Sequence, residues 1–322
     1  MDTTKNAVVR VEQKRKKMKE ESAMEQITKN KDFTLLHTLT VRNSDDKKQF
    51  TDMERLFKIS EALEDSPFQH CVQRNLFQAY SQVPFGKLPR KILAVSTHVD
   101  FKKETQKCFS DESDAEFLVG TYDNSITNTA MVTLMKEAKL PKNLVVVFTG
   151  DEEESSGGAD EFSDYVRNEL NRKVKCIVLD VTEDGYDADA AFTIENDCWK
   201  KGWGRKILTW ASAQSREWRY VPYGEENLSK KLIKELVPDD KKISEEADVD
   251  ETSAYYEDNS IRCFSFCLPA GLEDPEGKHA PGNSSKEAMH SADGLRVSKE
   301  NYWKYLEALR EVILVSAGEE LQ

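Results

Sequence analysis

Residues 145–162 have the sequence VVVFTGDEEESSGGADEF. The apolar, β-branched run at its start predicts a buried strand, because such continuous runs are typical of strands that are covered on both faces. Four acids follow the strand directly: Asp151, Glu152, Glu153 and Glu154. Carboxylates packed this closely repel one another. Either solvent separates them, or a cation lies among them.

The composition limits the classes of partner. The chain has 322 residues, of which 38% are apolar, enough for a core in one large domain or two small ones. Its net charge of −13 argues against nucleic acid and anionic membranes as partners, and favours cations or ligands with a positive group. No apolar run approaches the roughly 18 residues of a membrane span, and the N-terminal segment lacks the apolar stretch of a signal peptide.

The six cysteines form no CxxC pair. Cys176, Cys263 and Cys267 lie in apolar runs, so we expect them to be buried thiols rather than ligands. Together with the missing secretory signal, this pattern favours a reducing cytoplasm as the location.

Strand-like and helix-like segments alternate along most of the chain. Residues 1–30 are very polar and predict a helical or frayed arm, and residues 33–83 show helix-like apolar spacing, including Leu76, Phe77 and Tyr80. Strands are predicted at 91–97, 143–149, 174–180, 217–223 and 261–269, and helices at 130–140, 158–171, 202–215 and 298–317. The alternation predicts an α/β fold, a three-layer α/β/α sandwich with a mostly parallel central sheet flanked by helices.

Chemically active side chains follow the predicted strands. In parallel sheets ligands bind beyond the carboxyl ends of the strands, and those positions carry a set of five candidate metal ligands. They are His98, Asp123, Glu153, Asp180 and His290. Imidazole and carboxylate suit zinc, with cobalt or manganese as alternatives. Each residue alone has an ordinary structural role open to it, but five are too many for one tetrahedral ion and match two divalent metal ions if one carboxylate bridges them.

The segments THVD, GTYDN, TGDEEESSGGA, VLD and MHS, in this order, resemble the ligand motifs of the co-catalytic zinc exopeptidases of clan MH. That group contains aminopeptidases, carboxypeptidases, dipeptidases and N-acyl amino acid deacylases. The resemblance covers residues 90–315 and implies the phosphorylase/hydrolase-like zinc exopeptidase fold, with residues 31–322 as a single catalytic domain.

The resemblance also implies roles for individual residues. His98 and Asp180 would bind one metal, Glu153 and His290 the other, and Asp123 would bridge both. Asp100 would orient the imidazole of His98. Glu152 would be the general base, taking a proton from the attacking water and passing it to the leaving amine.

The acidic run can be aligned with the family pattern in two registers. The family pattern is Glu-Glu-x-Gly-x-x-Gly-small. Gly158 and Ala159 fit its end, which favours Glu152 and Glu153 as the functional pair, with Ser155 in place of a glycine. A register that uses Glu153 and Glu154 remains an alternative.

Motif spacing favours one branch of the family. His98 and Asp123 are 25 residues apart, which leaves no room for the large insertion of the tetrahedral, self-compartmentalising aminopeptidases. The 110 residues from Asp180 to His290 are mostly used by predicted strands and helices, so no full dimerisation lid is expected. The resemblance is therefore closest to the single-domain zinc aminopeptidases.

The predicted function is metal-dependent removal of N-terminal residues from a peptide or aminoacyl substrate. Asp250 and Glu251 are candidates to meet a free α-amine, and Tyr255 and Tyr256 to wall a side-chain pocket. A deacylase or dipeptidase is an alternative, and it would need a cation such as Arg262 or Lys278 for the substrate carboxylate. A metal-binding homologue without turnover and a one-metal, acyltransferase-like cyclase of the same fold are further alternatives.

Overall fold

A computed structural model describes residues 32–41, 53–101, 108–222, 230–243, 250–272 and 294–318. The predicted N-terminal arm, residues 1–30, and the predicted ligand His290 lie outside these ranges. Within them, no helix combines the length and the apolar character needed to cross a membrane.

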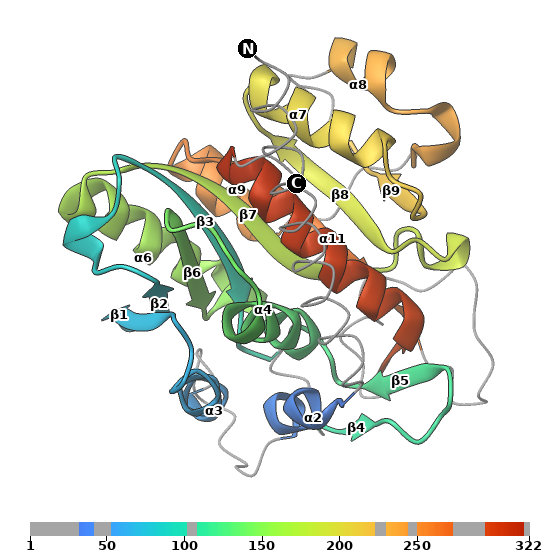
Figure 1. The fold of residues 1–322 in the computed structure, drawn as a ribbon, viewed down its shortest axis with the longest axis horizontal. Helices are drawn as coiled ribbons and strands as arrows, with labels where there is room; N and C mark the ends of the chain where they lie inside the picture. The colour runs from blue at the N-terminus through green and yellow to red at the C-terminus, as the bar shows by residue number, and fades with distance from the viewer. Residues whose placement is uncertain are drawn as a thin grey trace, which may run out of the picture.

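An eight-stranded sheet forms the centre of the fold (Figure 1). In the order in which they lie side by side, its strands are β1 (Gln69–Gln73), β2 (Phe77–Ser81), β6 (Leu144–Thr149), β3 (Lys91–His98), β7 (Lys173–Thr182), β10 (Arg262–Pro269), β8 (Phe192–Cys198) and β9 (Trp218–Tyr220). Strands β6, β3, β7 and β10 are parallel neighbours, as are β8 and β9. Strands β1 and β2 pair antiparallel at one edge, and β8 pairs antiparallel with β10. The predicted mostly parallel sheet is confirmed.

Helices lie on both faces of this sheet, and further helices pack against them. The helices are α2 (Thr34–Thr40), α3 (Met53–Ala62), α4 (Ser125–Glu137), α5 (Glu152–Ser155), α6 (Gly157–Tyr165), α7 (Lys201–Ser212), α8 (Lys230–Leu236), α9 (Glu251–Ser253) and α11 (Lys299–Ala317). Helix α8, for example, packs on α7. Turns of π-helix extend α6 over Val166–Leu170 and α9 over Ala254–Asp258, and 3-10 turns cover Phe85–Lys87, Tyr186–Ala188 and Asp239–Lys241.

Two hydrophobic cores lie between the sheet and its helices, one on each face. Helices α4, α7 and α11 pack on one face, where Met131, Leu309 and Val95 of β3 belong to one core. Helix α6 and the turn after α9 pack on the other, where Phe162 and Tyr255 join one core. Figure 1 shows α4 and α11 crossing one side of the strands and α6 on the other. The predicted three-layer sandwich is confirmed.

A second, smaller sheet was not predicted. Its strands, in spatial order, are β11 (Gly271–Leu272), β12 (Leu295–Ser298), β5 (Phe117–Gly120) and β4 (Ser110–Asp111), all antiparallel. Strand β5 ends three residues before Asp123 and β12 leads directly into α11. This sheet therefore fixes the approach of the chain to the edge where the predicted ligands lie.

The helix predicted around Leu76, Phe77 and Tyr80 is wrong, because the chain forms β2 there. Every residue of β2 is buried. Phe77 belongs to one core and Tyr80 to the other, so the strand is buried on both faces. A short strand covered on both faces lacks the polar alternation that would separate it from a helix.

Gly158 allows a close approach at the end of β6. The N–H of Gly150 donates to the carbonyl oxygen of Leu76 at 2.8 Å, and the carbonyl oxygen of Gly150 accepts from the N–H of Gly158 at 2.9 Å. A Cβ at Gly158 would lie 2.6 Å from both carbonyl oxygens. Only glycine therefore fits here, and its packing holds α5, which carries Glu152 and Glu153, at the strand end.

We expect Gly158→Ala to lower the free energy of unfolding by about 1–3 kcal/mol, since backbone atoms must move to admit the methyl group. Gly202→Ala is the matched control, because Gly202 lies exposed in α7 and a Cβ there meets nothing within 4 Å. That control should be neutral or slightly stabilising. Urea denaturation of the three proteins measures both effects, and equal stability of Gly158→Ala and the parent chain would contradict the packing argument.

Candidate metal centre

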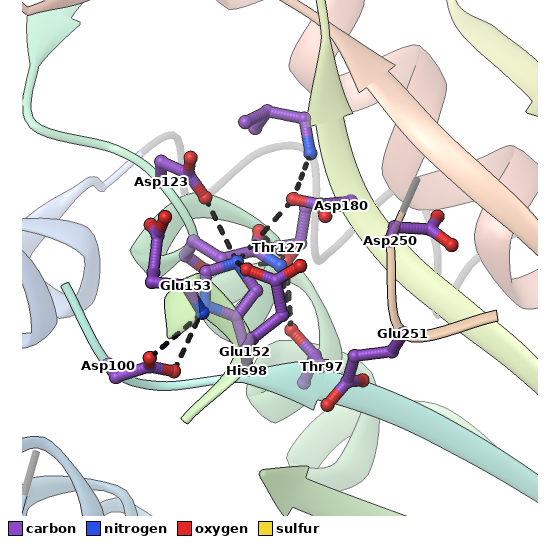
Figure 2. Close-up of polar contacts among 12 residues, drawn as sticks. Thr97, His98, Asp100, Asp123, Thr127, Glu152, Glu153, Asp180, Asp250 and Glu251 are labelled. Atoms are coloured by element: carbon purple, nitrogen blue, oxygen red, sulfur yellow. Dashed lines mark hydrogen bonds and ion pairs between the residues drawn. The ribbon is translucent and has the colours of Figure 1, made fainter. Parts of the chain in front are cut away.

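His98, the last residue of β3, lies at the centre of a cluster of acids (Figure 2). The residue is 2% exposed. Its Nε2 atom is 3.0 Å from Oδ1 of Asp123, 3.6 Å from Oδ1 of Asp180 and 3.9 Å from Oε2 of Glu152. Ligand atoms of His98, Asp123 and Glu153 all lie within 4.8 Å of one another. Side chains far apart in the sequence thus converge on one point.

The sheet topology explains this convergence. Strands β6, β3 and β7 are parallel neighbours, so their carboxyl ends meet at one edge. The start of α4 is fastened to the same edge: the side-chain amide of Asn124 donates to the carbonyl oxygen of Leu179 at 2.7 Å. The amide of Asn128 donates to the carbonyl oxygen of His98 at 2.9 Å. These bonds position Asp123, which immediately precedes Asn124.

Sequence reasoning missed these two asparagines. It expected the helix to begin near residue 130, whereas α4 begins at Ser125. Asn124 and Asn128 are one helical turn apart, and both side chains are fully buried. The signal was present in the segment DNSITNT, where two asparagines share one face of a helix extended by one turn.

Asp100 connects the imidazole to the acidic segment. Its Oδ1 atom is 3.4 Å from Nδ1 of His98, and its Oδ2 atom accepts from the N–H of Glu153 at 3.2 Å. Asp100 is 4% exposed. A carboxylate beside Nδ1 favours the tautomer that presents the Nε2 lone pair to a cation. This geometry supports an orienting role for Asp100.

Burial and neighbouring charges shift the pKa values of this site in opposite directions. Burial alone would lower the pKa of His98, but Glu152, Asp100, Asp123 and Asp180 raise it well above its ordinary value. Burial raises the pKa of Glu152 well above its ordinary value and the pKa of Asp180 to about 6, with His98 opposing both shifts. The protein alone therefore does not hold all these acids ionised.

A divalent cation would resolve this conflict. Its charge would offset the repulsion and keep the carboxylates deprotonated. One imidazole with several carboxylates is a donor set that zinc, cobalt and manganese accept. The residues present therefore fit a metal.

The structure brings together His98, Asp123, Glu153 and Asp180 of the predicted ligands, with Glu152 and Asp100 beside them. The roles of these residues, and that of His290, stay predictions. In the acidic run, Glu152 and Glu153 are half-buried, whereas Glu154 is exposed.

The predicted substrate-side residues have partners inside the protein. Glu251 is 1% exposed and accepts from the hydroxyl of Ser96 at 2.7 Å. Asp250 accepts from the N–H of Thr252 at 2.8 Å and so begins α9. Tyr255 is fully buried and donates to Ser96 at 2.9 Å, so its predicted place in a pocket wall is wrong. The ring of Tyr255 instead packs in the core on the α6 side of the sheet.

A scan against protein-family models and a search of curated proteins each found no match to this sequence. Solved structures do match. The LapA aminopeptidase of Legionella pneumophila has a TM-score of 0.57 at 10% identity, over 95% of this chain and 75% of that chain. PhTET1-12s, solved as a dodecamer, has a TM-score of 0.57 at 10% identity, over 90% and 99%. A putative aminohydrolase from methicillin-resistant Staphylococcus aureus has a TM-score of 0.54 at 11% identity, over 94% and 100%.

The chain has the fold of the clan MH zinc exopeptidases. Identity this low shows the fold alone, so membership of the clan and of any branch within it stays a prediction.

We expect Asp100→Ala to weaken zinc binding by about 10- to 100-fold, because the imidazole of His98 loses the carboxylate that orients it. Competition with a chromogenic chelator measures the affinity. Asp239→Ala is the control, since Asp239 is exposed and pairs with Lys242. Unchanged zinc affinity in Asp100→Ala would show that Asp100 does not act on His98.

Burial raises the pKa of Glu251 to about 7, with Asp100 adding to the shift and the hydroxyl of Ser96 opposing it. Between its ordinary pKa of about 4.3 and 7, the folded protein holds a proton that the unfolded chain has released. The contribution of Glu251 to stability therefore falls as pH rises through this window. We expect the stability difference between metal-free Glu251→Gln and the metal-free parent to grow in favour of the variant from pH 4.5 to 7. Guanidinium denaturation at several pH values measures it, and a difference independent of pH would refute the assignment.

Proposed function

We propose that the chain is a metal-dependent aminopeptidase, which hydrolyses the first amide bond of a peptide or aminoacyl substrate. The observation that carries the proposal is the buried His98, whose Nε2 atom has three carboxylates within 3.9 Å. We propose zinc as the metal, with cobalt and manganese as alternatives.

The proposed ligands are His98, Asp123, Glu153, Asp180 and His290, which would hold two ions with Asp123 between them. Bound divalent ions at such a centre supply an activated water and polarise the scissile carbonyl group. Asp100 would keep the imidazole of His98 in the orientation that binding needs.

Glu152 is the proposed general base. It lies beside the ligands, with Oε2 3.9 Å from Nε2 of His98, but outside the tight set formed by His98, Asp123 and Glu153. It is therefore free to take a proton from the attacking water and deliver it to the leaving amine. Burial raises its pKa, and the charge of the metals would lower it again, so both protonation states are accessible.

Charge favours a substrate with a free amine over one with a free carboxylate. The chain carries a net charge of −13, and the side chains around His98 are acidic. A deacylase or dipeptidase needs a cation for the substrate carboxylate. Arg262, the candidate among the described residues, stacks on the ring of Tyr256 with 4.9 Å between its guanidinium carbon and the ring centroid.

We expect Glu152→Gln to keep the metal content of the parent chain and to lose about 10²- to 10⁴-fold in turnover, because the variant cannot accept a proton. The assay uses aminoacyl and N-acetylated aminoacyl chromogenic amides with zinc, cobalt or manganese, and atomic absorption counts the metals. Glu154→Gln, the neighbouring exposed acid, should retain activity. An equal loss of turnover in Glu154→Gln would contradict the assignment of Glu152 and favour the alternative register, in which Glu153 and Glu154 are the functional pair.

The substrate panel also decides between reactions. Cleavage of free-amine substrates alone supports the aminopeptidase. Cleavage of the acetylated substrates would make the protein a deacylase. No cleavage of either class, with two metals bound, would favour a dipeptidase or a protein without turnover.

A further inference from the structure

Glu195, in the middle of β8, is a buried acid that the metal centre does not use. The residue is 5% exposed. Its Oε1 atom makes no hydrogen bond to any part of the chain that the structure describes. A buried carboxylate oxygen without a donor is costly, so this position calls for a functional explanation.

Strand register places Glu195 on the same face of the sheet as Asp180. Glu195 pairs with Ser265 of β10, and Asp180 of β7 pairs with Cys267, two residues further along β10. Paired residues and residues two apart point to one face of a sheet. Strands β7 and β8 flank β10, so the two backbones are about 10 Å apart across the sheet.

The neighbouring hydroxyl groups are committed elsewhere. Ser265 donates to the carboxylate of Asp250, and Thr193 donates to the carbonyl oxygen of Asp184 at 2.8 Å. Thr182 makes a side-chain hydrogen bond with Glu195. One carboxylate oxygen of Glu195 therefore stays without a donor, although hydroxyl groups surround it.

The charged groups with the strongest influence on Glu195 are all acids. Burial, and then Asp184, Asp250 and Asp180, raise the pKa of its carboxyl group well above the ordinary value. This part of the sheet face thus collects negative charge around Glu195. A positive group entering it would gain from every one of these acids.

We propose that Glu195 receives the cationic side chain of the substrate's first residue, so that the protein acts on peptides beginning with lysine or arginine. This specificity rests on the aminopeptidase function proposed above. The long stem of either side chain would run along the sheet face from the metal centre toward β8, and an arginine would present its planar fork to the carboxylate.

The distance argues for a side chain rather than for the α-amine. The α-amine is separated from the scissile carbonyl carbon by a single carbon atom, so it must stay beside the metals and Asp180. Glu195 lies two strands away, a separation of about 10 Å at the backbone. Only a charge at the end of a long side chain can reach it while the carbonyl group stays at the metal centre.

Matched neutral substrates test this assignment with the metal-loaded chain. The pairs are lysyl and norleucyl coumarin amides, and arginyl and citrullyl coumarin amides. We expect the parent chain to prefer the charged member of each pair. Glu195→Gln should lower kcat/KM for the lysyl and arginyl amides by about 30-fold or more, and leave the neutral amides unchanged. Glu235→Gln, which removes an exposed acid paired with Arg205, should behave as the parent chain.

A binding measurement separates this inference from the aminopeptidase proposal. Calorimetry compares lysinamide and norleucinamide on metal-loaded Glu152→Gln, with and without Glu195→Gln. Tighter binding of lysinamide that Glu195→Gln abolishes supports the pocket, even if no amide is hydrolysed and the proposed function fails. Hydrolysis with the same ratio of charged to neutral substrates in the parent and Glu195→Gln overturns the pocket and leaves the aminopeptidase intact.

A folding control accompanies these variants. Thermal unfolding should show Glu195→Gln to be at least as stable as the parent, since it removes a buried charge. If that variant does not fold, Glu195→Asp keeps the charge and should retain part of the preference for lysyl over norleucyl amides. Loss of folding in Glu195→Gln, together with no preference in Glu195→Asp, would make Glu195 a structural residue and overturn the proposal.

Discussion

Repulsion among carboxylates at one edge of the sheet is the constraint on which the site depends. The parallel order of β6, β3 and β7 delivers acids to a common edge, and burial removes the water that would screen them. Hydrogen bonds from the backbone, such as that from the N–H of Glu153 to Asp100, offset part of this cost. A bound divalent cation would offset the rest of this repulsion, so the proposed chemistry would follow from the same physical constraint as the fold.

The surrounding structure serves to hold these acids at fixed distances. Asn124 and Asn128 tie α4 to β7 and β3, and Gly158 lets α6 pack directly on the end of β6. Two separate cores, one on each face, then fix the sheet from which the ligands project. The side chains that would bind metal are thus held in place by the strands and helix starts that carry them. Most pairs of these side chains repel each other.

The sequence predicted the parts of the structure that depend on local pattern. Strands β3, β6, β7 and β10 are continuous apolar runs, and the acids after them follow from the geometry of parallel sheets. Other parts depend on contacts between distant segments. Strand β2 looked helical because both of its faces are buried, and β8 was missed because FTIENDC carries Glu195, Asn196 and Asp197 inside a buried strand. Tyr255 was predicted to line a pocket, but its ring is part of the second core.

Glu195 is one of the buried polar residues that made β8 hard to predict, and it is also the residue on which the proposed specificity rests. Asp250 accepts from Thr252 and Ser265, and Glu251 accepts from Ser96, although Oε1 of Glu251, like Oε1 of Glu195, has no donor among the described residues. Glu195 lies on the sheet face shared with Asp180, where a bound partner would supply the donor that its Oε1 atom lacks. Because acids surround it, that partner must be positively charged, and its reach from the metal centre gives it the length of a basic side chain.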